Sequence, residues 1–321
     1  MNINYIIIVL GEPYSTFSEI LAKYFTKNKK PKKKIILIGN LKLLKKQLKK
    51  LNYFLPLNNI YEIVEAKKSK INIINIEFKH NKTFTDISKR SNRYIKESFD
   101  KSLEIMKEFK DECVLVNGPI SKKHFLDKKF LGITEFLSKK TRSKNEVMLI
   151  YNEKMSVSPI TTHIPIKYVA KKISMRKLSN NILMIEDFYT NVLKKKRAHF
   201  AILGLNPHCE TIDSFSEEEK IIIPTIKYLK KKGINISGPF SSDTFFLKKN
   251  IDKYNVVIGM YHDQVLTPIK TLFQFNAINI TIGLPFIRIS PDHGPNSEML
   301  GKNLSDPSSF NYVIKFIEKL K

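Results

Sequence analysis

Three of the seven histidines follow predicted strands within a few residues, each in a turn that contains Pro or Asp. They are His163 in "TTHIP", His208 in "NPHCE" and His262 in "YHDQ". A lone histidine in such a turn is usually a structural hydrogen-bonding residue. Three neutral imidazoles that leave a fourth position open make a divalent-metal site of catalytic type. Spacing alone leaves both interpretations open, because the three residues are far apart in the sequence.

Two carboxylates and two cations accompany these histidines. Asp243 lies in "GPFSSDTFF" and Asp263 follows His262, so both are candidates to orient histidines or to transfer protons, and the sequence does not choose between these roles. Lys270 is either a surface lysine or an anion-binding group. Arg288, in the apolar string "LPFIRIS", pairs either with a structural carboxylate or with a ligand phosphate.

The elements that must position these residues are short β-branched runs alternating with amphipathic stretches. This alternation predicts an α/β fold around mainly parallel sheet, in which ligands bind beyond the carboxyl ends of the strands. Residues 147–161 read as two strands about a polar turn, which predicts an antiparallel piece. The expected strands are 5–10, 34–39, 113–118, 200–205, 255–260 and 278–284, and the expected helices are 41–51, 86–110, 165–173, 180–196, 217–232 and 308–320.

The composition indicates the cell compartment and the class of partner to expect. The formal net charge is +26, yet only six of the 56 basic residues are arginine, the residue that nucleic-acid readers favour. We therefore expect solvated lysine surfaces and no nucleic-acid partner. No stretch reaches the roughly 18 apolar residues of a membrane span. The start "MNINYIIIVLGEP" reads as a first strand, and two cysteines without a CxxC motif predict a reducing cytoplasm.

Taken together, several strings are more specific than any one of them. Their order and spacing resemble the 4-hydroxythreonine-4-phosphate dehydrogenase family of vitamin B6 biosynthesis. The similarity runs over essentially the whole chain and is densest from 158 to 294. The strings are "VNGPISK", "TEFL", "TTHIPIKYV", "LGLNPH", "GPFSSDTFF", "YHDQVLTPIK" and "INITIGLPFIRISPDHG".

The resemblance implies the two-domain fold of isocitrate and isopropylmalate dehydrogenases, with a mixed sheet core and flanking helices. We expect a nucleotide-side domain of residues 1–130 plus 280–321, and a metal, substrate and dimerisation domain of residues 131–279. It implies a homodimer with active sites at the subunit interface. The implied reaction is NAD- or NADP-dependent oxidation of 4-(phosphooxy)-L-threonine at C3, then decarboxylation to 3-amino-2-oxopropyl phosphate.

The resemblance also assigns site residues. It implies one divalent ion per site, Zn, Mg or Co, on three histidines, the last of which is contributed across the dimer interface. It implies four substrate-binding residues and a loop for the adenine side of the nucleotide. The metal ligands are His163, His208 and His262, the substrate-binding residues are Thr134, Lys270, Asn279 and Arg288, and the cofactor residues are Asp292, His293 and Gly294.

Three departures from the family pattern bear on substrate choice. Ile133 stands where the family has a histidine before the threonine, the turn "GEPYSTFSE" at 11–19 lacks the usual glycines, and "CETIDSF" at 209–215 replaces a glycine-rich loop. The alternatives are a related dehydrogenase for another four-carbon phosphorylated hydroxy acid, and a degenerate non-catalytic homologue. Because the metal-binding and anion-binding residues are kept, we expect an active enzyme.

Overall fold

The structure is a computed structural model, and it describes residues 2–28, 31–126, 130–212, 214–274, 276–291 and 294–320. The chain forms two compact units, residues 1–143 with 284–321 (unit 1) and residues 144–283 (unit 2). The sequence places these boundaries at 130 and 280. The observed division assigns Thr134 to unit 1, together with the helix that carries it.

Unit 1 contains a parallel sheet of six strands in the order β3-β4-β2-β1-β5-β12. The central strands are continuous β-branched runs such as "YIIIV" and "CVLVN", as expected for strands covered on both faces. The strands are β1 (Tyr5–Val9), β2 (Lys34–Gly39), β3 (Leu57–Ile60), β4 (Ile71–Asn75), β5 (Cys113–Asn117) and β12 (Ile287–Pro291). The helices are α1 (Phe17–Lys27), α2 (Leu41–Lys50), α3 (Asn92–Glu108), α4 (Ile133–Thr141) and α11 (Ser308–Lys319).

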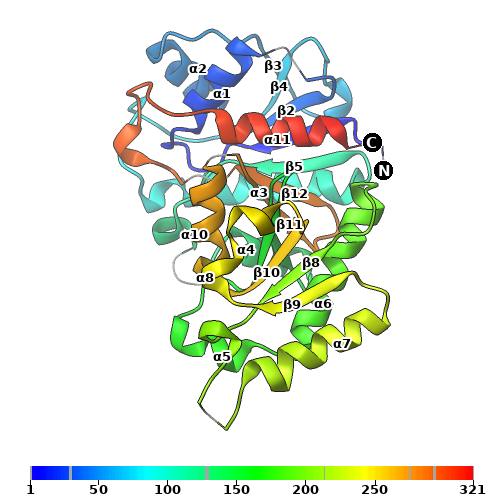
Figure 1. Cartoon of the computed structure of the whole chain (residues 1–321). Coiled ribbons are helices and arrows are strands. Elements are labelled where there is room, and N and C mark those ends of the chain that lie inside the picture. The colour runs from blue at the N-terminus through cyan, green and yellow to red at the C-terminus, as the bar shows by residue number, and fades with distance from the viewer. Residues whose placement is uncertain are drawn as a thin grey trace. The chain divides into compact units, whose positions relative to one another are not determined.

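Helices cover both faces of this sheet because its side chains alternate between them. Ile7 of β1 and Leu115 of β5 belong to the cluster that contains Phe99 of α3 and Phe136 of α4. Helix α11, drawn just above β5 in Figure 1, packs against β12 and α1, and Phe310 of α11 makes an edge-to-face contact with Phe17 of α1. Two opposed apolar layers thus hold the carboxyl ends of β1, β5 and β12 in fixed register.

Unit 2 contains a mixed sheet in the order β11-β6-β7-β10-β8-β9. β6 pairs antiparallel with β7 and β11, which confirms the antiparallel piece, and β7, β10, β8 and β9 run parallel. The strands are β6 (Val147–Tyr151), β7 (Ser156–Thr161), β8 (Phe200–Leu203), β9 (Ile236–Phe240), β10 (Val256–Tyr261) and β11 (Ile278–Ile282). The helices are α5 (Val169–Lys172), α6 (Met175–Asp187), α7 (Ile223–Lys231), α8 (Ser242–Phe245), α9 (Lys248–Ile251) and α10 (His262–Phe273).

Most of the expected elements are present, with shorter regular helices. The stretch expected as a helix at 86–110 is helical over Asn92–Glu108, and the one expected at 180–196 is α-helical only to Asp187. Ser216 Oγ accepts a hydrogen bond from the backbone N–H of Glu219 (3.3 Å), and Gly233 has a left-handed φ of 79° after α7. Those two residues therefore mark the start and end of the helical segment expected at 217–232.

Candidate active site

The three histidines lie in turns that follow three neighbouring parallel strands of unit 2. β7 is next to β10 and β10 is next to β8, so their carboxyl ends share one edge of the sheet. His163 follows β7, His262 follows β10 as the first residue of α10, and His208 follows β8 in a short 3-10 turn. We call these three residues the histidine edge.

Two of the histidine rings approach each other within one chain. The ring centres of His163 and His262 are 5.6 Å apart, with an interplanar angle of 41°. Two imidazoles that bind one tetrahedral ion at about 2.0–2.1 Å have ring centres roughly 5 Å apart. The spacing of this pair is therefore suited to a shared divalent ion.

His208 is held differently. Its backbone is in the left-handed region, with φ 56°, and that of Cys209 is too, with φ 63°. A left-handed conformation is uncommon for residues other than glycine, and two in succession reverse the chain abruptly. The side chain is 76% exposed, and its Nδ1 lies 3.9 Å from Oδ2 of Asp243. No group of three or more His, Cys, Asp and Glu side chains is placed to hold a metal among the residues that the structure describes.

Each of the two candidate carboxylates lies beside a histidine. Asp263 Oδ1 is 2.6 Å from Nδ1 of His262, which orients the ring and leaves the lone pair of Nε2 available. Asp243 accepts a hydrogen bond from Ser241 Oγ (2.6 Å), and this bond, more than the nearby His208, holds the pKa of Asp243 below its ordinary value. Asp263 is therefore the closer partner, and both geometries suit the orientation of a histidine.

Gln264 joins the turns of the histidine edge, and it was not selected from the sequence. Its Oε1 accepts from the backbone N–H of Met260 (2.6 Å), and its Nε2 donates to the carbonyl of Gly204 (2.6 Å) and to Ser242 Oγ (2.7 Å). These atoms belong to β10, the end of β8 and α8. The side chain is buried, so one amide fixes three elements that carry His262, His208 and Asp243.

Glu218 supports the turn before His208. It accepts hydrogen bonds from the backbone N–H groups of Leu205 (2.7 Å) and Asn206 (2.9 Å). Burial by itself would raise the pKa of Glu218, but these bonds prevail and hold it below its ordinary value. A buried carboxylate thus holds the backbone of the turn that leads to His208.

The remaining substrate-binding candidates of unit 2 are on α10 and β11. Lys270 is exposed in the ninth position of α10, two turns beyond His262. Asn279 lies on β11 opposite Ile150, and its Oδ1 is buried without a hydrogen-bond partner among the described residues. A buried amide oxygen without a partner is costly, and a bound ligand is one way to satisfy it.

In unit 1, Arg288 is the largest fully buried side chain, with 1% of its surface exposed. Its Nε donates a 2.8 Å hydrogen bond to Oδ1 of Asn117, at the end of β5. Burial lowers the pKa of Arg288 to about 10, and the charge of Glu135 acts in the opposite direction. Arg288 therefore remains a cation at neutral pH. We call Arg288, Asn117 and Glu135 the arginine cluster; Asn117 and Glu135 were not selected from the sequence.

Helix α4 carries the other substrate candidate of unit 1. Thr134 is buried in its first turn, next to Glu135. Ile133 begins the helix and packs against the apolar cluster of unit 1. The family histidine is thus replaced by a side chain that contributes to the core.

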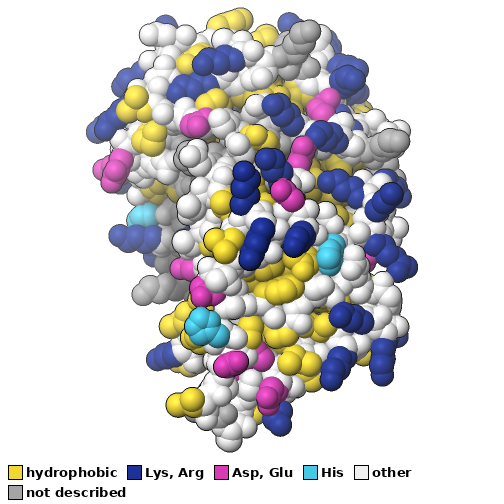
Figure 2. All heavy atoms as spheres, in the orientation of Figure 1, with side chains coloured by type: hydrophobic (Ala, Val, Ile, Leu, Met, Phe, Trp, Pro, Cys, Tyr) yellow, Lys and Arg dark blue, Asp and Glu magenta, His cyan; other side chains and the backbone are white. Residues whose placement is uncertain are grey.

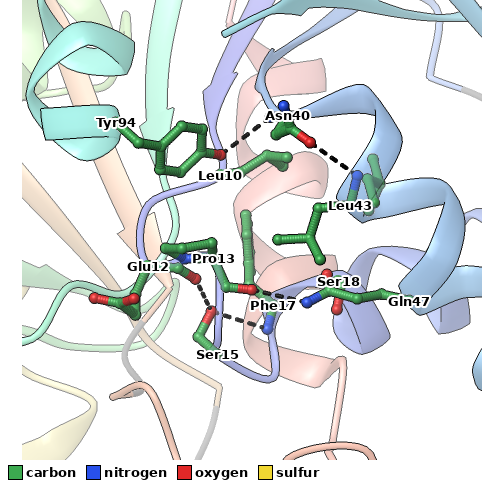
Figure 3. Close-up of a pocket in the computed structure, with 11 residues that line it drawn as sticks. Leu10, Glu12, Pro13, Ser15, Phe17, Ser18, Asn40, Leu43, Gln47 and Tyr94 are labelled. Carbon is green, nitrogen blue, oxygen red and sulfur yellow. Dashed lines mark hydrogen bonds between the residues drawn. The ribbon is translucent and has the colours of Figure 1, made fainter. Parts of the chain in front are cut away.

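The turn between β1 and α1 is filled by side chains. Gln47 Nε2 donates to the carbonyl of Pro13 (2.8 Å), and Ser15 Oγ caps the backbone N–H of Phe17 (3.4 Å), as Figure 3 shows. The free volume that remains is about 20 Å³, room for about one water molecule. Gly11 has φ 74° and a carbonyl of Pro119 where a Cβ would stand, so only glycine fits there. This turn is not a phosphate cradle of the glycine-rich kind.

Of the expected cofactor residues, Asp292 and His293 lie outside the described residues. Gly294 is exposed, and the next carbonyl, of Pro295, accepts a hydrogen bond from the backbone N–H of Thr16 (3.2 Å). The end of this loop is therefore tied to the start of α1.

The charge is spread over the surface. On the face drawn in Figure 2, described Lys and Arg side chains are scattered among acidic and apolar ones. No helix in the described part of the chain is long and apolar enough to cross a membrane. Cys113 and Cys209 are free thiols.

Comparisons with known proteins match nearly the whole chain to one family. Residues 31–317 match the family described as pyridoxal phosphate biosynthetic protein PdxA. A curated relative from Sulfurihydrogenibium sp. (strain YO3AOP1), named 4-hydroxythreonine-4-phosphate dehydrogenase, is 36% identical over 322 residues, 98% of this chain and 97% of the relative. A relative of the same name from Vibrio parahaemolyticus is 32% identical and covers 81% of each chain.

Solved structures agree on the fold. The 4-hydroxythreonine-4-phosphate dehydrogenase of Klebsiella pneumoniae superposes with a TM-score of 0.84 at 24% identity, covering 98% of this chain and 99% of that one. An isocitrate dehydrogenase from Methylococcus capsulatus superposes with a TM-score of 0.51 at 8% identity, covering 99% and 85%. The expected isocitrate-dehydrogenase-like fold is confirmed.

Proposed function

This chain belongs to the family of pyridoxal phosphate biosynthetic protein PdxA, and we propose how its own residues carry out the dehydrogenase reaction for which its relatives are named. The reaction oxidises the C3 hydroxyl of 4-(phosphooxy)-L-threonine. The hydrogen on C3 leaves as hydride to the nicotinamide ring of NAD or NADP, and the hydroxyl proton leaves to a base. The 3-keto acid then loses CO₂ from C2, C2 takes up a proton in its place, and the product is 3-amino-2-oxopropyl phosphate.

The observation that carries this proposal is the approach of His163 to His262, with 5.6 Å between ring centres, at the carboxyl edge of a parallel sheet. Imidazole nitrogens suit Zn and Co, and Mg is the weaker match for such a donor set. A divalent ion bound there supplies acidity to the substrate hydroxyl and stabilises the negative charge on its oxygen. Asp263 keeps His262 in the tautomer that leaves Nε2 available.

Arg288, Lys270, Asn279 and Thr134 are the proposed substrate-binding residues. A buried, charged guanidinium pairs strongly with a phosphate because its planar fork of N–H donors can bond two phosphate oxygens at once, in surroundings of low dielectric. Asn279 supplies a buried amide, and Lys270 a flexible cation. Their part is to hold C3 in place for hydride transfer, and such orientation can supply several kcal/mol.

We propose that the enzyme is a homodimer. Unit 2 exposes large apolar side chains close in sequence to two of the histidines: Ile166 after His163, and Ile212 and Phe215 after His208. Apolar surface of this kind is typical of protein interfaces. The pairing of His163 with His262 in one chain favours His208, rather than His262, as the histidine whose place depends on a second copy.

The test is an assay of the purified protein with 4-(phosphooxy)-L-threonine, NAD or NADP, and added Zn, Co or Mg. The formation of reduced nicotinamide is measured. We expect turnover that stops when the metal is chelated and returns when it is restored. The matched substrate is the analogue with a hydroxyl in place of the C2 amino group. Comparing the two substrates tests whether Ile133 has altered the specificity for the amino group. Turnover of the analogue alone would point to a different phosphorylated hydroxy acid, and no turnover of either would point to a non-catalytic homologue.

A further inference from the structure

Asn117 is a buried amide beside the buried arginine of unit 1. β5 runs parallel to β12, with Leu115 opposite Arg288. Because side chains alternate along a strand, Asn117 projects from the same face as Leu115. Its side chain is 3% exposed, and its Oδ1 receives the 2.8 Å hydrogen bond from Arg288 Nε. The contact joins residues 171 positions apart.

The amide is fixed in one orientation. Asn117 Nδ2 donates to the carbonyl of Gly118 (2.9 Å), so Oδ1 must face the arginine. Gly118 is itself tied to β1, because its backbone N–H donates to the carbonyl of Val9 (2.8 Å). Rotation of the amide by half a turn would set Nδ2 against the Nε–H of Arg288, donor against donor. Two strands therefore determine where the acceptor lies.

This bond constrains the guanidinium without neutralising it. The five N–H donors of arginine lie in one rigid plane, so a fixed bond at Nε also sets the direction of the two terminal amino groups. A carboxylate in the same place would bind Nε as well, but it would add a second negative charge to that of Glu135 and weaken the attraction for an anion. A neutral amide keeps both the direction and the charge.

We propose that Asn117 is a positioning residue for anion recognition, whose amide oxygen aims the Arg288 guanidinium so that its terminal amino groups bind the substrate phosphate. This inference rests on the proposed function for the identity of the phosphorylated substrate. It adds a residue that does not itself touch the substrate, and it gives the buried Asn117 amide a part in directing Arg288.

Asn117→Leu removes the acceptor at similar side-chain volume. We expect the KM for the phosphorylated substrate and the Kd for inorganic phosphate to rise about 30-fold, about 2 kcal/mol at 1.4 kcal/mol per decade. The value of kcat should stay within about threefold, since binding and not the chemical step is affected. If this variant does not fold, Asn117→Asp keeps the size and the hydrogen bond but adds a negative charge, and we expect a loss of affinity at least as large.

A double-mutant cycle with Arg288→Met separates positioning from general stability. If Asn117 acts through Arg288, Asn117→Leu has no further effect on phosphate binding once Arg288 is Met. The matched control is Asn72→Leu, because Asn72 is an equally buried amide of unit 1 that bonds to the carbonyl of Ile35 (2.9 Å). It should lower the melting temperature and leave the Kd for phosphate unchanged.

An unchanged Kd and KM in Asn117→Leu, or effects that add fully to those of Arg288→Met, would overturn the inference. The phosphate titration keeps the two proposals distinct. If the wild type oxidises the substrate but Asn117→Leu binds phosphate normally, the inference fails and the proposed function stands. If phosphate binding follows the cycle but the wild type oxidises no such substrate, the proposed function fails and the inference stands.

Discussion

The histidine edge of unit 2 and the arginine cluster of unit 1 are built in opposite ways. Arg288 is fully buried, and its direction is set by a partner that is itself buried. At the histidine edge, His208 is 76% exposed on a left-handed turn, and the His262 side chain is 33% exposed. The arginine cluster is enclosed within unit 1, whereas the histidine edge exposes its histidine side chains at the surface of unit 2.

The difference fits what each region is proposed to bind. A phosphate carries its own charge, and a buried cation attracts it strongly because little water competes. A divalent ion needs several ligands at fixed distances, and ligands near the surface can exchange water for substrate oxygen. The comparison predicts that changes at the histidine edge reduce turnover, whereas changes in the arginine cluster reduce affinity.

The largest effect is expected for His163→Ala. Loss of a ligand should remove tightly bound metal and reduce kcat by about a thousandfold or more, because several kcal/mol of charge stabilisation are lost. Metal analysis by mass spectrometry and steady-state kinetics measure both. His199→Ala is the control, since His199 lies at the amino end of β8 and bonds to the carbonyl of Lys253. Full activity in a metal-free His163→Ala enzyme would contradict the assignment.

The next effect is expected for Arg288→Met, which keeps much of the volume and removes the charge. Loss of a buried charge-assisted contact of about 2–3 kcal/mol should raise KM about a hundredfold with little change in kcat. Kinetics at saturating and limiting substrate separate the two constants. A fall in kcat at unchanged KM would place Arg288 in the chemical step and not in binding.

Unit 1 also contains a buried acid, Glu12, whose titration is expected to affect stability. Burial raises the pKa of Glu12 to about 7, against the hydrogen bond from Ser91. The folded state then holds this proton at a pH where the unfolded chain has lost it, so the stability contribution is present below pH about 4.5 and is lost as the pH rises to about 7.

We therefore expect the unfolding free energy of the wild type, relative to Glu12→Gln, to fall by about 2–3 kcal/mol between those values. Urea denaturation of both proteins across this pH range measures the difference. A constant difference between the two proteins would show that Glu12 is not the titrating group.

The smallest effects are expected for the carboxylates of the histidine edge, and they should differ from each other. Asp263→Asn should weaken metal binding about tenfold, because Asp263 contacts His262 at 2.6 Å. Asp243→Asn should change it less than about threefold, because the 3.9 Å pair with His208 is exposed on both sides. Competitive metal titration with a chelating dye ranks the two, and the reverse order would make Asp243 the more important partner.

The features that were predicted correctly from the sequence are those that depend on residues adjacent along the chain. β8 and β10, which end at the histidine edge, are short apolar runs, and Asp263 is adjacent to His262. The sequence did not predict β3 and β4, whose strings "LNNI" and "INIIN" are broken by asparagines that weaken the apolar pattern.

Hydrogen-bond partners that lie far apart along the chain could not be predicted from the sequence. Asn117 and Gln264 act through bonds to residues 171 and 60 positions away, and their types alone indicate nothing unusual. Ile133 was recognised as a departure, but its packing into the core depends on neighbours that only the fold supplies. What sequence cannot give is the pairing of buried polar groups, which is decided by tertiary contacts.

The most direct test of the proposed chemistry is anomalous X-ray diffraction from crystals of the wild type grown with Zn or Co. We predict one ion within about 2.0–2.3 Å of an imidazole nitrogen of both His163 and His262 of the same chain. An ion bound by only one of these rings, or bound away from both, would contradict the central claim that the two form the catalytic metal site.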